Sequence, residues 1–270
     1  KNSVGIIISQ SGETADTLAA QRMIRAAGAP IVSIVNVVGS SVARESDGVL
    51  YTYAGPEIGV ASTKAYTTQV TTFYLIALHM ARVRGTLTPA QQQELIRGLW
   101  ELPEKGQQIL DNKQEIIDCC DQYWRYENFL YLGRGANLPS AYEGALKLKE
   151  ISYIHAEGYA AGEMKHGPIA LICPECPTVA IAVEGDVYDK MLSNMQEVRA
   201  RDGKVIAVAF EGDKEIEKYA DFVLHVPRCH EHLSPVLVAI PLQLLAYYIA
   251  DKRACDVDQP RNLAKSVTVE

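Results

Sequence analysis

The sequence lacks any run of basic residues: its 270 residues carry 26 lysines and arginines against 33 aspartates and glutamates, a formal net charge of -7. This balance argues against nucleic acid or an anionic membrane surface as a partner. A small anionic substrate needs only a local positive site, so overall acidity does not exclude one. No apolar run reaches the length of a membrane span and no signal peptide is visible, so we expect a cytoplasmic chain without a membrane partner.

The sequence also lacks a disulfide framework, because six scattered cysteines are too few for a chain of this size. Cys173 and Cys176 have the spacing of a zinc half-site or a redox pair, and Cys229, His230 and His232 could supply further ligands. A zinc motif normally repeats its pairs cleanly, which this one does not. We therefore expect no metal and no cofactor, and interpret the cysteines as core or loop thiols.

One stretch near the start organises the chain. The mostly β-branched run Val4–Ile8 predicts a buried strand, and three hydroxyls follow it, at Ser9, Ser11 and Thr14, before a helix that Gly28 ends. The N–H groups and the positive dipole end of a helix N-terminus favour an anion there. Helix capping would explain one such hydroxyl. Three hydroxyls this close together favour a phosphate site instead. The buried side of this helix is predicted to consist of Leu18, Ala19, Met23, Ala26 and Ala27.

Apolar runs alternate with helical patterns through the rest of the first domain. Strands are predicted at Ile31–Val38 and Gly48–Tyr51, with a short helix between them that begins at Gly39-Ser40-Ser41. This alternation predicts an α/β fold with a parallel sheet flanked by helices on both faces, in a three-layer α/β/α arrangement. Ligands of such sheets bind beyond the carboxyl ends of the strands, where residues 9–14 lie.

A long helix over 61–83 is predicted next, with Ser62 and Thr63 at its start. These hydroxyls suit a second wall of the same pocket, although helix capping explains them equally well. The segment Arg84–Pro89 is the predicted domain boundary, since Thr88 before Pro89 signals a new helix. We expect a first domain over 1–86, a second over 87–254 and a C-terminal tail over 255–270.

The second domain repeats the α/β pattern. Its turn Val183-Glu184-Gly185-Asp186 stands where the first domain has Ser9-Gln10-Ser11-Gly12. Two carboxylates there would repel a phosphate, so we expect one sugar-phosphate site per chain. The next predicted helices are one that runs through Leu95–Trp100 and ends before Pro103, and one that runs through Ile116–Trp124 after it. The other predicted elements are strands at 129–132, 178–183, 204–210 and 222–226, helices at 140–154, 187–200 and 235–254, and a glycine-rich loop at 156–169.

Candidates for proton chemistry lie in the second domain. Glu143, Lys147 and Glu150 share one helix face at spacings of four and three residues. A solvated ladder of ion pairs explains this spacing, and so does a carboxylate base beside a lysine, suited to moving a proton between adjacent sugar carbons. His155 and His166 are loop histidines, which could open a sugar ring or simply be hydrogen-bonded surface groups. A lysine in the polar tail could form an imine with a ketose, although a mobile end is the simpler interpretation.

The stretch Ser9–Thr14 resembles the phosphosugar-binding signature of SIS (sugar isomerase) domains. Glu57–Lys64, Glu143–Pro168 and the terminus Asp256–Glu270 narrow the resemblance to the isomerase half of the glucosamine-6-phosphate synthase family, the glutamine–fructose-6-phosphate aminotransferases. The resemblance spans essentially the whole chain. It implies two SIS domains, a homodimer or higher oligomer, and conversion of fructose 6-phosphate with ammonia into glucosamine 6-phosphate.

Roles follow from this resemblance position by position. Glu150 would be the base that moves a proton between C1 and C2 of the fructosimine, and Lys147 would assist proton transfer at the ring oxygen. His166 would open the ring, reaching the site of a neighbouring subunit, and Lys265 would form the Schiff base with the opened ketose. The tail would then be an active-site lid. The phosphate would be held by Ser9, Gln10, Ser11 and Thr14, and the sugar lined by Val60, Ser62 and Ala264.

The sequence departs from the family in two respects. It contains no glutaminase domain with its cysteine nucleophile, so we interpret it as a piece of a longer protein whose glutaminase domain is its partner. It also begins inside the first SIS domain, after that family's Gly-Thr-Ser turn. A different class stays open, since an SIS unit can be a sugar-phosphate sensor without chemistry. Such a sensor would need residues 9–14 but not Glu150, His166 and Lys265.

Overall fold

The computed structural model describes residues 3–265, and the chain divides into two compact units. Unit 1 comprises Lys1–Thr86 with Arg261–Glu270, and unit 2 comprises Leu87–Pro260. The C-terminal segment therefore belongs to the same unit as the N-terminal strands, although some 170 residues of unit 2 separate them in the sequence.

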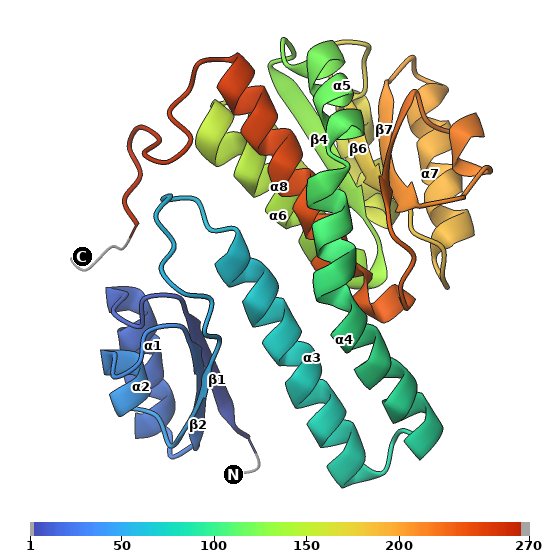
Figure 1. Ribbon diagram of the computed structural model, residues 1–270. Helices are drawn as coiled ribbons and strands as arrows, with labels where there is room; N and C mark the ends of the chain where they lie inside the picture. The colour runs from blue at the N-terminus through green and yellow to red at the C-terminus, as the bar shows by residue number, and fades with distance from the viewer. Residues whose placement is uncertain (1–2, 266–270) are drawn as a thin grey trace. The chain divides into compact units, whose positions relative to one another are not determined.

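Unit 1 is built on three parallel strands in the order β1-β2-β3. Helices α1 and α2 lie on one face of this sheet, and α3 is on the other side (Figure 1). Leu18 and Ile24 of α1 pack against a buried cluster that joins the sheet to α2 and consists of Ile7, Ile31, Val35, Val42 and Ala43. The elements are β1 (Gly5–Ser9), α1 (Ala15–Ala26), β2 (Ile31–Val35), α2 (Ser41–Arg44), β3 (Gly48–Tyr51) and α3 (Lys64–Arg84).

The first strand is where predicted, but it is not buried on both faces. Ile7 points into the core, whereas Ile6 and Ile8 are each 42% exposed. Successive side chains of a strand alternate between faces, and only the face under α1 and α2 is tightly covered. On the other face, strand residues and α3 enclose an apolar cavity of about 700 Å³.

Helix α1 ends before Gly28 as predicted, but its predicted buried side is wrong. Ala19 is exposed and Met23 is 74% exposed, while the fully buried residue is Gln21. The Gln21 amide donates to the Val42 carbonyl at 3.0 Å and to Ser46 Oγ at 3.0 Å. The buried Gln21 amide thus links α1 to the α2 segment, where the Val42 carbonyl also accepts from Ser46 Oγ at 2.8 Å.

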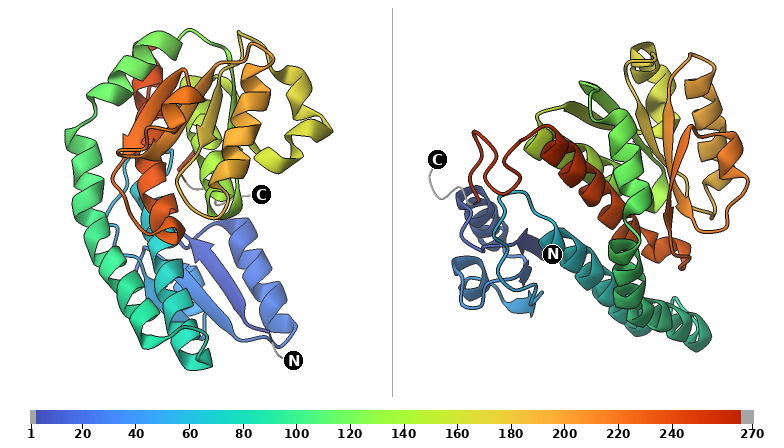
Figure 2. Two further views of the ribbon diagram at one scale, coloured as in Figure 1. Left: turned by 90° about the vertical axis from the view of Figure 1, so that its right-hand side faces the viewer. Right: turned by 45° about the horizontal axis from the view of Figure 1, so that its top comes forward.

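Unit 2 is a five-stranded parallel sheet in the order β5-β4-β6-β7-β8. Helix α7 covers one face and α5, α6 and α8 cover the other (Figures 1 and 2). Its strands are β4 (Asn128–Gly133), β5 (His155–Ala160), β6 (Thr178–Ile181), β7 (Val205–Phe210) and β8 (Phe222–Val226). Its α-helices are α4 (Pro89–Asp111), α5 (Gln114–Tyr123), α6 (Leu138–Ser152), α7 (Tyr188–Arg199) and α8 (Ser234–Lys252).

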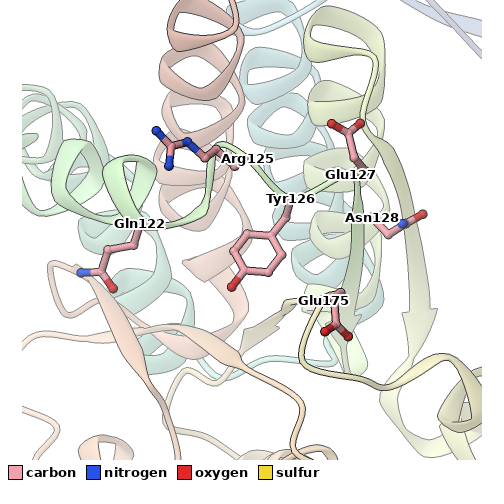
Figure 3. Close-up of a pocket in the computed structure, with 6 residues that line it drawn as sticks. All are labelled: Gln122, Arg125, Tyr126, Glu127, Asn128 and Glu175. Carbon is pink, nitrogen blue, oxygen red and sulfur yellow. The ribbon is translucent and has the colours of Figure 1, made fainter.

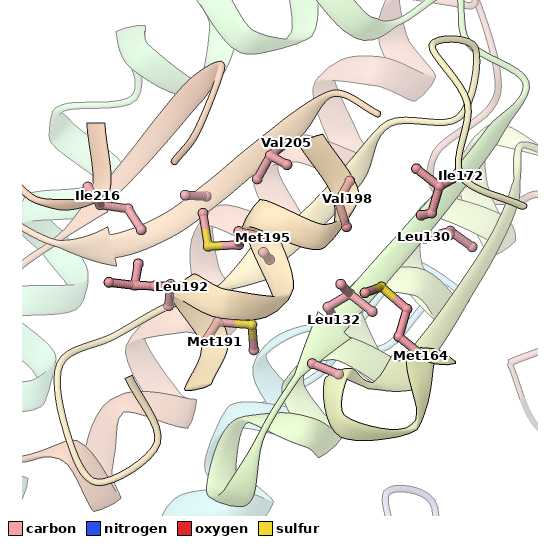
Figure 4. Packing of buried hydrophobic residues seen from close by; sticks show 14 of the residues in the cluster. Leu130, Leu132, Met164, Ile172, Met191, Leu192, Met195, Val198, Val205 and Ile216 are labelled. Carbon is pink, nitrogen blue, oxygen red and sulfur yellow. The ribbon is translucent and has the colours of Figure 1, made fainter. Parts of the chain in front are cut away.

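The core under α7 is packed with methionine and branched side chains. Leu130 and Leu132 on β4 face Met191 and Met195 on α7, and Met164 closes one end of the cluster (Figure 4). Burial of such side chains is the main stabilising contribution to unit 2.

Two details of unit 2 differ from the sequence prediction. The predicted loop 156–169 contains the edge strand β5 and two 3₁₀ helices, Ala161–His166 and Pro168–Leu171. Helix α4 continues through Pro103 instead of ending before it. It begins as predicted, with Thr88 and Gln91 forming a reciprocal capping box.

Helix α8 corrects the expectation that no apolar run reaches the length of a membrane span. The segment Glu231–Lys252 is long and apolar enough to cross a membrane by length and composition, with a mean hydropathy of 1.8 over an 18-residue window. However, 72% of that window is buried inside the protein, where α8 packs against α4, α5 and α6. These properties are typical of the central helix of a folded domain.

Candidate functional site

The turn after β1 is shaped by its own hydroxyls. Ser9 Oγ accepts a hydrogen bond from Gly12 N–H at 2.8 Å, and Ser11 Oγ accepts one from Glu13 N–H at 3.2 Å. Thr14 occupies the N-cap of α1, but its side chain makes no capping hydrogen bond. Capping therefore does not account for Thr14, and three hydroxyls remain gathered at a helix N-terminus, where backbone N–H groups favour an anion.

Gly12 allows the turn to pack against the start of α2. Its φ is +70°, and a Cβ at this position would lie 2.1 Å from Ser40 Oγ. Across this close approach, Val42 N–H donates to the Gly12 carbonyl at 3.0 Å and Ser41 N–H donates to Glu13 Oε1 at 2.8 Å. Only glycine fits here without strain, so the turn and the loop after β2 are held together.

Asn36 links the loops that follow all three strands, a role that the sequence analysis missed. Its backbone N–H donates to the Gln10 carbonyl at 3.3 Å. Its side chain donates to the Gly55 carbonyl at 2.8 Å and accepts from Ala54 N–H at 2.8 Å. The sequence feature that could have identified Asn36 is its place directly after a predicted strand, at the carboxyl edge of a parallel sheet.

The tail residue Lys265 contacts the loop before α3. Its Nζ lies 2.9 Å from Glu57 Oε2 and donates to the Gly59 carbonyl at 2.7 Å. Val60 and Ser62 in the same loop are half-buried, and Ala264 is exposed. The structure thus brings Lys265 to the segment that carries two of the predicted sugar-lining residues. The rest of the predicted lid, 266–270, lies outside the described residues.

The Glu57 carboxylate is itself almost fully enclosed, since its side chain is only 5% exposed. Oε1 accepts from Thr63 N–H at 2.8 Å and from Ala65 N–H at 3.2 Å, at the N-terminus of α3. Burial alone would raise the pKa of Glu57, but the hydrogen bonds from Lys265, Thr63 and Ala65 outweigh it, so the pKa is lowered and the group stays ionised.

In unit 2, α6 carries a buried lysine between two carboxylates. Lys147 Nζ lies 2.6 Å from Glu150 Oε2 and 3.6 Å from Glu143 Oε1. The Lys147 side chain is 4% exposed, that of Glu143 9% and that of Glu150 22%. This excludes the solvated ladder that spacing alone allowed. An enclosed ammonium with a partly accessible carboxylate beside it is an arrangement that can exchange protons with a bound molecule.

The two loop histidines are surface groups in this chain. His166 ends a 3₁₀ helix, has a side chain that is 75% exposed, and lies 3.8 Å from Glu163. His155 begins β5 and lies 3.9 Å from Glu157, with a side chain that is 65% exposed.

The turn of unit 2 that matches Ser9–Gly12 is occupied by the chain's own charges. Glu184 forms two hydrogen bonds with the Arg228 guanidinium, and Glu231 Oε2 accepts from Asp186 N–H at 2.9 Å. The carboxylate of Glu184 is therefore paired with Arg228 and is not the free, repelling charge that was predicted. A carboxylate of this chain already fills the place of an anion, and the charge of Glu184 is paired.

A separate polar pocket of about 520 Å³ is lined by residues around the start of β4 (Figure 3). It lies at the amino end of that strand, whereas parallel sheets bind ligands beyond their carboxyl ends. No predicted site residue lines it. Its lining residues are Gln122, Arg125, Tyr126, Glu127, Asn128 and Glu175.

No set of three or more histidine, cysteine or acidic side chains with the arrangement of a metal site occurs among residues 3–265. Cys173 and Cys176 do not join Cys229 and the neighbouring histidines. Burial raises the pKa of the Cys176 thiol to about 11, with a smaller contribution from Cys173. Cys176 is therefore an inert thiol at neutral pH.

Comparison with known families gives a match to the SIS domain, over residues 1–79 and 123–250. A glutamine–fructose-6-phosphate aminotransferase (isomerizing) from Methanosarcina acetivorans is 56% identical over 270 residues, which are all of this chain and 44% of that protein. A protein of the same description from Thermus thermophilus is 53% identical over 267 residues, 99% of this chain and 44% of that protein. The chain thus spans less than half the length of the curated relatives it matches.

A solved structure supports the same relationship. The C-terminal domain of glucosamine-fructose-6-phosphate aminotransferase from Francisella tularensis superposes with a TM-score of 0.89 at 42% identity. The match covers 96% of this chain and 75% of that one. The folds agree at the level of both units.

Proposed function

This chain belongs to the SIS domain family, and from that premise we propose that it is the isomerase part of a glutamine–fructose-6-phosphate aminotransferase. In this proposal it binds fructose 6-phosphate, accepts ammonia from a glutaminase domain of the full-length protein, and isomerises fructosimine 6-phosphate to glucosamine 6-phosphate. The names of the relatives and the shared fold support this activity.

Substrate binding is assigned to unit 1. Ser9, Ser11 and Thr14 donate hydroxyl hydrogen bonds to the phosphate, and the Gln10 side chain adds an amide donor. Neutral donors at a helix N-terminus bind a dianion without adding a cation that would retain the product. Val60, Ser62 and Ala264 line the sugar in this proposal. Lys265 forms a Schiff base with the open ketose, which makes the tail a lid.

Proton transfer is assigned to unit 2. Glu150 is the base that moves a proton between C1 and C2, since its carboxylate is the more accessible of the two that flank Lys147. Lys147 assists proton transfer at the ring oxygen. His166 opens the ring of a sugar that is bound by the neighbouring subunit of a homodimer. Its side chain is 75% exposed in this chain, which leaves it accessible to a neighbouring subunit.

The observation that carries the proposal is the buried lysine between two carboxylates in unit 2, together with Lys265 in unit 1. A sugar-phosphate sensor needs only the hydroxyl turn. Burying three charged groups costs free energy, and binding of a sugar phosphate by that turn does not require it. An enzyme of this kind would work in the cytoplasm, in keeping with the reduced cysteines.

The test is solvent-proton exchange. Incubation of the chain with fructose 6-phosphate in deuterated water, followed by NMR, should show deuterium at C1 or C2. Glu150→Gln should abolish exchange while fructose 6-phosphate still binds, and Ser11→Ala should weaken binding itself. Binding without exchange in the unsubstituted chain would favour the sensor.

A further inference from the structure

The ion pair between Lys265 and Glu57 joins residues 208 positions apart, and the charge on Lys265 has no other carboxylate partner among the described residues. The pairing is enclosed, because the Glu57 side chain is 5% exposed and that of Lys265 30%. The second Nζ hydrogen bond, to the Gly59 carbonyl, fixes the direction in which the amine points. A two-point anchor of this kind orders a lysine that would otherwise sample many rotamers.

Glu57 is also held by backbone N–H groups at the N-terminus of α3. Both of its oxygens are used, Oε1 for the Thr63 and Ala65 N–H groups and Oε2 for Lys265. Because the first two donors open the 21-residue helix α3, the carboxylate is bound at the positive end of a long helix dipole. Its charge and position are therefore set by the fold before any sugar binds.

We propose that Glu57 is the positioning residue for Lys265 and the counter-ion of the protonated imine that Lys265 forms with the open-chain ketose. This inference rests on the proposed function, since it deepens the role given there to Lys265. Glu57 does not take part in the covalent step. It holds the nitrogen in place and balances its positive charge before and after that step.

The covalent step explains why a permanent carboxylate suits this place. The Lys265 ammonium loses one proton to water, and the free amine pair forms a bond to the ketose carbonyl carbon while the carbonyl π pair moves to oxygen. That oxygen takes one proton from nitrogen and one from solvent and leaves as water, as the nitrogen pair closes the C=N bond. Nitrogen carries one positive charge at the start and one at the end, so a fixed anion stabilises both states.

The experiment measures two quantities separately: the yield of the covalent adduct, and the amide hydrogen exchange of the tail. The chain is mixed with fructose 6-phosphate and sodium borohydride, and the reduced adduct on Lys265 is quantified by mass spectrometry from pH 6 to 9. Glu57→Gln keeps an oxygen that accepts the N–H groups of α3 but loses the charge. We expect its adduct to fall roughly tenfold near pH 8, because the weakened contact no longer holds the Lys265 nitrogen where the ketose carbonyl can reach it.

Two controls separate positioning from folding. Glu45→Gln makes the same change in an exposed ion pair of unit 1, with Arg22 at 3.0 Å, and should trap as much adduct as the unsubstituted chain. Lys265→Arg keeps the ion pair but cannot form the imine. Amide hydrogen exchange over 261–265, measured without sugar, should therefore match the unsubstituted chain in Lys265→Arg and be faster in Glu57→Gln.

The outcomes distinguish this inference from the function it rests on. Failure to trap any adduct in the unsubstituted chain would overturn the proposed imine and, with it, the counter-ion. Normal trapping in Glu57→Gln, or unchanged tail exchange, would overturn the role of Glu57 alone and leave the proposed function standing.

Discussion

Lys147 shows how one buried charge depends on its neighbours. It lies between Glu143 and Glu150 with almost no access to water. Desolvating an ammonium is costly, and two carboxylates within reach offset that cost. The group is stable only as a set, which also keeps Glu150 at a defined position for proton transfer.

Removing the cation should therefore be strongly destabilising. Lys147→Met leaves the buried Glu143 and the partly buried Glu150 without their shared cation, and we expect a loss of about 3 kcal/mol or more in the free energy of unfolding. Urea titration measures it. Lys105→Met breaks a partly exposed pair with Glu101 on α4 and should cost below ~1 kcal/mol. Equal losses in the two variants would contradict the buried ion set.

A second residue-level prediction concerns pH. The hydrogen bond that His225 Nδ1 donates to the Glu115 carboxylate raises the pKa of His225, against the opposing effect of burial. A raised folded pKa means that the protonated histidine stabilises the fold fully below its unfolded pKa of about 6.5, and this contribution is lost as pH rises through the folded pKa. Glu115→Gln should thus lower Tm more at pH 6 than at pH 9, by thermal denaturation. A difference independent of pH would refute the assignment.

Helix α6 can approach α8 closely because Gly144 has no side chain. A Cβ on Gly144 would lie 2.8 Å from Tyr131 Cε1 and 3.0 Å from Leu242 Cδ1. Tyr131 is fully buried on β4, so its ring has little room to move. The helix that carries Glu143, Lys147 and Glu150 is thus set by contact with both the sheet and α8.

We expect Gly144→Ala to destabilise the chain, although alanine favours a helix over glycine by ~1 kcal/mol. Overpacking in a filled core typically costs ~1–3 kcal/mol, which outweighs that gain. Gly98→Ala is the matched control, because its Cβ would meet only the flexible end of Leu233, at 2.7 Å. Chemical denaturation should find Gly98→Ala less destabilised than Gly144→Ala, and the reverse order would argue against the tight α6–α8 contact.

The two units differ in how much apolar surface they bury. Unit 2 has a continuous core on both faces of its sheet, whereas the sheet of unit 1 has one tightly packed face and an apolar cavity on the other. Less buried apolar area means less stability. The units should therefore unfold at different denaturant concentrations.

Both tryptophans, Trp100 and Trp124, lie in unit 2, so their fluorescence reports that unit alone. Circular dichroism at 222 nm reports helices of both. We expect ellipticity to begin falling at a lower urea concentration than fluorescence, because unit 1 unfolds first. Coincident curves by the two probes would show one cooperative unit.

The order and type of most elements followed from local sequence. β-branched runs ended by glycine or polar turns gave the strands, and Thr88-Pro89 gave the start of α4 at the right residue. These signals are local, since propensity and capping act over a few residues. The hydroxyl turn at 9–14 was visible for the same reason.

The tertiary structure decided which faces are buried and which distant groups meet. Ile6, Ile8 and Met23 are exposed because burial depends on what covers an element, which no periodicity states. The spacing of Glu143, Lys147 and Glu150 was equally compatible with a solvated ladder until α6 was seen to be enclosed. The pairing of Lys265 with Glu57 joins residues 208 positions apart. Only the folded chain brings them together, because such contacts depend on topology and not on local pattern.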